Sequence, residues 1–159
     1  MSQRFNLRSL GMFVGVALCA TLPAQANAPP GHYTAGMGMV SDNKTTLTWQ
    51  QAAPTIGGDS GNGEYTWSNA KSYCAALSLN GSGWRLPTVK ELVSLVDVTK
   101  QSPCIDTSAN GFPATPAAAF WSATPLASSP LSEAWGVAFT NGYAYHEGVA
   151  AMNRVRCVR

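Results

Sequence analysis

The stretch Trp-Arg-Leu-Pro-Thr at residues 84–88 constrains the fold more than any other part of the sequence. Pro87 disfavours helical geometry at Leu86, so the chain must arrive there extended. Thr88 and Glu91 have the spacing of a capping box, in which each side chain satisfies a backbone donor at the start of a helix. The sequence therefore predicts a strand that turns sharply into a helix, with Thr88 as the N-cap.

The side chains around this joint divide into an inward and an outward set. Trp84 and Leu86 alternate around Arg85, so we expect Arg85 to point away from them. A helix cap does not account for Arg85, which makes it a candidate for binding. The apolar face of the short helix, which we expect to end near Asp97, consists of Val89, Leu92, Val93 and Val96.

The first residues have the layout of a secretory signal peptide. Arg4 and Arg8 precede an apolar run over residues 10–22, which is short for a transmembrane helix. Small residues follow this run. We therefore expect a signal peptide over residues 1–26, with cleavage after Ala26 and no membrane insertion of the mature protein.

Two alternatives remain open at this boundary. Cleavage after Ala28 fits a second small-residue pattern, and a lipoprotein would use Cys19 as the acylated residue. The lipoprotein fits less well, because Leu18 stands where a small residue is expected. After the signal we expect a flexible lead-in over residues 27–38 and a single domain over residues 39–159.

The charge of the exported part narrows the classes of partner. The chain has 10 Lys and Arg residues and 8 Asp and Glu residues. Arg4 and Arg8 leave with the signal, so basic and acidic residues become equal in number. A near-neutral domain disfavours a nucleic-acid binder that relies on overall positive charge.

A helix and several strands are predicted by local patterns. Thr66 is a plausible N-cap for a helix that Gly81 and Gly83 end, and its buried face consists of Trp67, Ala70, Cys74 and Leu77. Strands are expected over residues 45–50, 120–124 and 153–159, and residues 57–64 are typical of a loop. Trp135, Val137 and Phe139 alternate before Asn141-Gly142, which is the strongest signal for a two-residue hairpin turn.

These segments, read in order, resemble the Lcl C-terminal domain family, which is named after a collagen-like adhesin. The resemblance covers Met39 to Arg159. Asn69 stands where the family commonly has an acidic residue, and Ala123 where it commonly has Ser. The matching motifs are LTWQ, TWSNAKSYCAAL, WRLPTVKELVSLVD, IDTSANGFPATP, FWSAT, AWGVAFTNGYAY and VRCVR.

The resemblance implies an α+β domain of C-type-lectin-like architecture, with two short helices, a small antiparallel sheet and long irregular loops. Its joint and last strand also look like those of formylglycine-generating enzymes. The adhesin domain that names the family is associated with trimers and with sulphated glycosaminoglycans. This chain lacks the collagen-like repeat that would precede such a domain, so the resemblance leaves the oligomeric state open.

Three cysteines remain after the signal and allow three pairings. Cys74 lies on the buried helix face and Cys157 on the inward face of the last strand, which favours a Cys74–Cys157 disulfide. Cys104 is then the odd thiol. A catalytic interpretation would make it a nucleophile with His146 as base and Glu147 as orienting group.

Two surfaces are candidates for ligand binding. Arg154, Arg156 and Arg159 share a basic edge that Arg85 and Lys90 could extend if the joint packs nearby, and such an edge suits sulphate or carboxylate groups. The hairpin end could stack on sugar rings through Tyr143, Tyr145 and His146. The alternatives are an exposed edge strand whose charges block aggregation, and tyrosines that pack in the core.

A calcium site is a weaker possibility, because Asp59, Asn62 and Glu64 lie on a Gly-rich loop but do not match the spacing of an EF-hand. We therefore expect an exported binding domain with no cofactor and no catalytic residues, which recognises an anionic glycan or a surface protein. The alternatives are an enzyme of the formylglycine-generating type and a structural subunit of a surface assembly.

Overall fold

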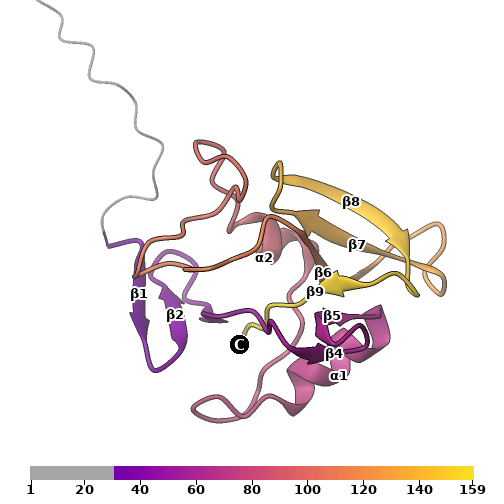
Figure 1. Cartoon of the computed structure of the whole chain (residues 1–159), viewed down its shortest axis with the longest axis horizontal. Helices are drawn as coiled ribbons and strands as arrows, with labels where there is room; N and C mark the ends of the chain where they lie inside the picture. Colours follow the sequence, from indigo (N-terminus) through magenta and orange to yellow (C-terminus); the bar gives the residue numbers. More distant parts are fainter. Residues whose placement is uncertain (1–30) are drawn as a thin grey trace, which may run out of the picture.

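A computed structural model describes residues 31–159, which form two sheets and two short helices (Figure 1). The smaller sheet is antiparallel, with its strands in the order β1-β2-β3. Its strands are β1 (Tyr33–Gly36), β2 (Met39–Asp42) and β3 (Thr48–Gln50). The expected lead-in over residues 27–38 is wrong for β1, because the chain there pairs with β2 and buries Tyr33.

The larger sheet is mixed, with its strands in the order β4-β5-β9-β6-β7-β8. The β6–β9 and β4–β5 pairs are parallel, and the other pairs are antiparallel. Strand β8 therefore lies at one edge. The strands are β4 (Gly57–Gly58), β5 (Asn62–Tyr65), β6 (Ala119–Pro125), β7 (Glu133–Ala138), β8 (Tyr143–Gly148) and β9 (Asn153–Arg154).

The two predicted helices are present and shorter than expected. Helix α1 (Trp67–Ala76) begins after Thr66 and ends before the glycines that were expected to end it. Helix α2 (Val89–Val93) has the predicted capping box between Thr88 and Glu91, and it ends at Val93 rather than near Asp97. Because helices and sheets are both present but not in alternating order, the fold class α+β is confirmed. The C-type-lectin-like architecture stays a prediction.

Three local predictions need correction. Residues 57–64, expected as a loop, include β4 and most of β5. The β7–β8 hairpin is confirmed, but Ala138 pairs with Tyr143, so its turn has four residues rather than two. The longer turn lets Phe139 leave the strand and become fully buried.

The predicted last strand over residues 153–159 is also mostly wrong. Only β9 lies in the larger sheet, and the chain then crosses to the joint and to the smaller sheet. Val158 forms antiparallel bridges with Arg85 and with Trp49. Arg85 and Val158 exchange two backbone hydrogen bonds of 2.9 Å each. We call residues 153–159 the closing segment, because they connect both sheets to the joint.

The core consists of two buried clusters. The first lies around α2 and the β6–β7 pair, and it includes Leu92, Phe120 and Val137. The second lies between α1 and the larger sheet, and it contains Cys74 and Cys157. These two cysteines form the expected disulfide, while Cys104 is free and buried. Within residues 31–159, none of the helices has the length and apolar character needed to cross a membrane.

We expect reduction of the disulfide to destabilise the domain strongly. Cys74 and Cys157 are 83 residues apart, and closing a loop of this size stabilises the folded state by about 4 kcal/mol in the chain-entropy model. Urea unfolding with and without a phosphine reductant measures this loss. The Cys104→Ser variant is the control and should respond to reduction as the unaltered protein does. Equal unfolding midpoints with and without reductant would contradict the prediction.

Candidate functional site

The predicted basic edge does not exist as a surface, because Arg156 is fully buried. Its Nη1 donates to the Gln51 carbonyl at 2.7 Å, and its Nη2 donates to Thr115 Oγ1 at 2.7 Å. The guanidinium also lies 4.4 Å from the ring centre of Phe112. Burial lowers the pKa of Arg156 to about 9, so the side chain remains charged at neutral pH. It therefore holds the interior together and cannot meet a large ligand.

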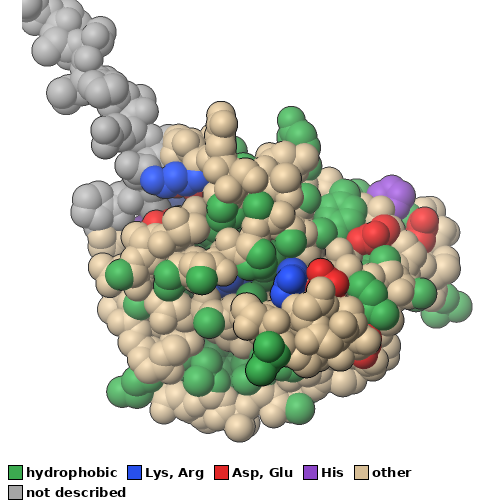
Figure 2. Space-filling view, viewed as in Figure 1, with side chains coloured by type: hydrophobic (Ala, Val, Ile, Leu, Met, Phe, Trp, Pro, Cys, Tyr) green, Lys and Arg blue, Asp and Glu red, His purple; other side chains and the backbone are tan. Residues whose placement is uncertain are grey.

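The other two arginines of the closing segment are also engaged within the protein. Arg154 donates to the Asn62 carbonyl, and its Nε lies 3.7 Å from Glu64 Oε1. Arg159 stacks on Trp84, with 4.8 Å from its guanidinium carbon to the ring centre, and donates to Asn80 O at 3.1 Å. On the face shown in Figure 2, Lys and Arg side chains are scattered rather than gathered into a patch.

Arg85 points away from the core as predicted, and its function within the joint is now clear. Its Nη1 and Nη2 donate to the two carboxylate oxygens of Glu91 at 2.8 and 2.6 Å. Glu91 also accepts from the Thr88 backbone at 2.8 Å. The hydrogen bonds from Arg85, followed by those from Thr88, lower the pKa of Glu91 to about 2. Arg85 therefore reinforces the helix cap.

The oxygens of the possible calcium loop already have partners. Asp59 Oδ2 accepts from the backbone N–H and the hydroxyl of Thr66 at 2.7 and 2.8 Å, and Oδ1 accepts from Asn69 at 2.7 Å. These hydrogen bonds, the one from the Thr66 backbone first, lower the pKa of Asp59. Asp59 thus holds the N-cap residue Thr66 and the side chain of Asn69 at the start of α1, where the Thr66 side chain makes no cap hydrogen bond. The loop carboxylates Asp59 and Glu64 therefore serve the fold.

The structure does not assemble the proposed catalytic group. Cys104 is buried, and its Sγ lies 3.8 Å from the Thr140 carbonyl. His146 and Glu147 are neighbours on β8, so they point to opposite faces of the sheet. His146 Nδ1 lies 3.8 Å from Glu133, whereas Glu147 accepts from Tyr145 at 3.0 Å and from Asn153.

The same alternation divides the predicted sugar-stacking residues. Tyr143 and Tyr145 lie on one face of β8, and His146 lies on the other. Tyr143 is 72% exposed. Tyr145 is half-buried, and burial, followed by the charge of Glu147, raises its pKa above the ordinary value. The three side chains therefore do not form one stacking surface.

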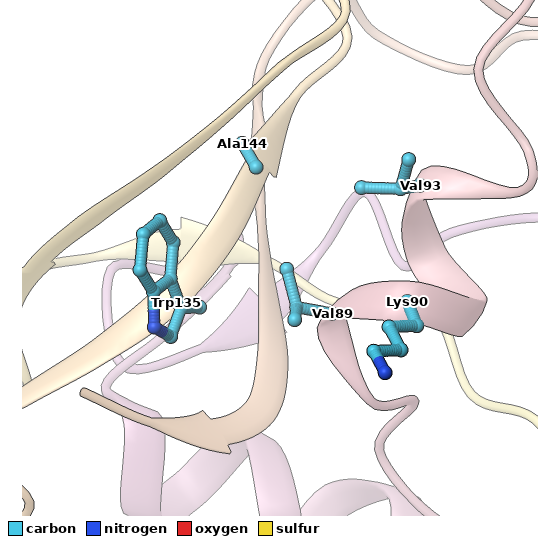
Figure 3. A pocket seen from close by; sticks show the side chains of 5 residues that line it. All are labelled: Val89, Lys90, Val93, Trp135 and Ala144. Carbon is cyan, nitrogen blue, oxygen red and sulfur yellow. The ribbon is translucent and has the colours of Figure 1, made fainter. Parts of the chain in front are cut away.

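An open groove lies on the His146 face, between α2 and the β7–β8 hairpin. Trp135 pairs with His146 and Val137 pairs with Ala144, so these four side chains share this face. Leu92 of α2 packs into the same core cluster as Val137 and holds the helix over the sheet. The groove has a volume of about 260 Å³ and is lined by Val89, Lys90, Val93, Trp135 and Ala144 (Figure 3).

We call this feature the α2–β8 groove. Figure 3 shows Val89 and Val93 on α2 facing Trp135 and Ala144 across it. The surface that lines it is apolar, because Lys90 contributes only the carbon part of its side chain there; Lys90 itself is exposed. The ring of His146 lies edge-on to Trp135, 5.4 Å between centres, beyond the lining.

The signals for this groove in the sequence are incomplete. The helical pattern predicts that Val89 and Val93 face the core, yet Val93 is 41% exposed. Trp135 stands out only as an alternating strand residue, and nothing in the sequence distinguishes Ala144.

The sequence profile of the Lcl C-terminal domain matches residues 38–159, which is most of the chain. The chain belongs to the Lcl C-terminal domain family. A search of curated proteins found no match. Within this Lcl C-terminal domain, the α2–β8 groove is a candidate site that the structure assembles, and it includes none of the residues predicted from the closing segment.

We expect the Arg156→Met variant to unfold more easily than the unaltered protein by about 2–4 kcal/mol. Met fills much of the same volume, but the carbonyls of Gln50 and Gln51 and the hydroxyl of Thr115 lose their buried donor. Urea unfolding measures the difference. Lys44→Met, at an exposed position, is the control and should change stability by less than about 0.5 kcal/mol. Unaltered stability of Arg156→Met would show that these hydrogen bonds contribute nothing.

We expect Glu91→Gln to destabilise the protein by about 1–2 kcal/mol at pH 7, in a pH-dependent way. The folded pKa of Glu91, about 2, lies below the ordinary glutamate value of 4.5. The carboxylate therefore stabilises the fold above about pH 4.5, and this contribution is lost as the pH falls toward 2. Unfolding of both proteins across this range should show the difference shrinking with acid. Glu133→Gln, which removes a carboxylate outside the joint, is the control. A difference in the free energy of unfolding between the unaltered protein and Glu91→Gln that stays constant with pH would contradict the assignment.

Proposed function

We propose that this protein is an exported, non-catalytic binding domain that recognises its ligand at the α2–β8 groove. The observation that carries the proposal is an open, largely apolar groove beside an exposed edge strand. Binding sites combine apolar lining with a few polar groups that fix orientation. At the rim of this groove the ammonium of Lys90 is such a group, and Glu133 and His146 extend the polar rim along the hairpin.

Export is supported by two independent features. The sequence of residues 1–26 has the layout of a signal peptide, although it lies outside the residues that the structure describes. The Cys74–Cys157 disulfide suits an oxidising compartment such as the periplasm or the extracellular space.

A function without chemistry is supported by the engagement of the candidate groups. The Cys104 thiol is buried against the Thr140 carbonyl, and Cys74 and Cys157 are joined to each other. Asp59, Glu64 and Glu91 each hold part of the fold. A nucleophile needs access to substrate and a base within hydrogen-bond reach. Cys104 is buried, and within residues 31–159 its sulfur lies against the Thr140 carbonyl, which is not a base.

The buried and paired arginines change what an anionic glycan could contact. Arg154 and Arg156 are engaged within the protein and are not available to bind sulphate, so an anionic ligand would contact Lys90 instead. A sugar ring could still stack on Trp135 within the groove. Glycans and proteins therefore remain the two ligand classes to test, and both would occupy the same groove.

The proposal is tested by blocking the groove. Ala144 is exposed, so Ala144→Trp should fold normally while its indole fills the groove. The purified protein is applied to a glycan panel that includes heparin-like chains and to a displayed library of short peptides, at low and physiological salt. We expect saturable binding to one of them that Ala144→Trp weakens by at least about tenfold.

The matched control is Ala75→Trp, which places the same side chain on the exposed side of α1. It should leave binding unchanged. Absence of binding to every probe, or binding that Ala144→Trp leaves intact, would overturn the proposal.

A further inference from the structure

Strand β8 has one side free for another strand. All six of its residues pair with β7, and β8 ends the strand order of the larger sheet. Within residues 31–159, no strand pairing or isolated bridge involves the other side of β8. An edge strand presents a row of backbone N–H and C=O groups that can pair with another chain.

Most of the usual protections of an edge are missing from β8. Such strands are commonly very short, bulged, or supplied with Lys, Pro or other charged side chains. Strand β8 has six residues, contains neither Lys nor Pro, and keeps an unbroken register with β7. Its one carboxylate, on Glu147, is half-buried and accepts hydrogen bonds from Tyr145 and Asn153. The opposite edge of the sheet is β4, which has only two residues. The exposed edge is therefore confined to the side of the sheet that carries the groove.

The groove would accept a side chain from a strand added to β8. Directly opposed residues on neighbouring strands have Cβ atoms about 5 Å apart on the same face of the sheet. A residue placed opposite Ala144 would thus lie beside a small side chain. It could extend over Ala144 toward Trp135 and Val93, which line the groove.

The charge at the rim of the groove indicates which kind of residue the partner should carry next to this apolar side chain. Lys90 is exposed and belongs to none of the ion pairs found within residues 31–159. Glu133 lies farther along the hairpin, beside His146. An acidic residue near the apolar anchor would therefore complement Lys90.

A second copy of β8 would not supply this pattern. In an antiparallel pair of β8 strands, the residues on the groove face would again be Ala144, His146 and Gly148. None of these is a large apolar side chain, and none is acidic.

We infer that the partner is a protein segment that adds to β8 as an extended strand. It places an apolar side chain in the α2–β8 groove and an acidic side chain near Lys90. This inference rests on the proposed function, because it assigns the partner of the same groove. Main-chain hydrogen bonds supply affinity in such strand addition, and the pocket for alternate side chains supplies specificity.

The test selects binders to the purified protein from a displayed library of random peptides long enough to pair with the six residues of β8. We expect enriched peptides to alternate apolar and polar residues and to carry an acidic residue near one apolar position. In a synthetic peptide of the enriched sequence, N-methylation at the alternate residues whose N–H groups point toward β8 removes these donors. It should lower the affinity by at least about tenfold. N-methylation at the intervening residues should have less effect.

Variants of the protein locate the bound peptide. Ala144→Trp and Lys90→Glu should each weaken binding by at least about fivefold, whereas Lys44→Glu, an exposed lysine beside the smaller sheet, should not. Circular dichroism and thermal unfolding confirm that each variant is folded.

The outcomes separate this inference from the proposed function. Ligands that are glycans alone, with binding sensitive to Ala144→Trp, would overturn strand addition and leave the groove as the binding site. Peptide binding without the alternating effect of N-methylation would also overturn strand addition. Binding that no groove variant affects would overturn both.

Discussion

The backbone pairing between Arg85 and Val158 anchors the joint that leads into α2, and α2 forms one wall of the groove. It fastens the joint to the closing segment, and Val158 in turn bridges to Trp49 in the smaller sheet. On the other side of the joint, the Pro87 carbonyl accepts a hydrogen bond of 2.6 Å from the Ala123 backbone in β6. Helix α2 begins two residues after Pro87, so the backbone hydrogen bonds of the joint fix the start of the helix that forms one wall of the groove.

Features set by near neighbours in the chain were predictable from the sequence. The capping box of Thr88 and Glu91 depends on residues three positions apart, and the outward direction of Arg85 follows from alternation. The β7–β8 hairpin was recognised from its alternating residues and its Asn-Gly pair. The disulfide was favoured because both cysteines lay on faces expected to be inward. In each case the decisive interaction is local or depends on one buried face.

The incorrect prediction for Arg156 and the missed groove have a common physical cause. Alternation indicates which residues share a face, but it does not indicate whether that face meets water. Arg156 was placed on the outer face of an edge strand, whereas the closing segment runs through the interior and both of its faces are covered. The groove was missed for a related reason. Val93 and Ala144 are far apart in the sequence, and only the packing of α2 on the sheet brings them together.

The closing segment also affects when the domain can fold. Residues 153–158 complete the larger sheet, supply one half of the disulfide and bridge both Trp49 and Arg85. Everything synthesised earlier lacks these contacts until the closing segment is available. If the chain crosses a membrane unfolded and N-terminus first, the core and the Cys74–Cys157 disulfide are completed only after residues 153–158 have crossed.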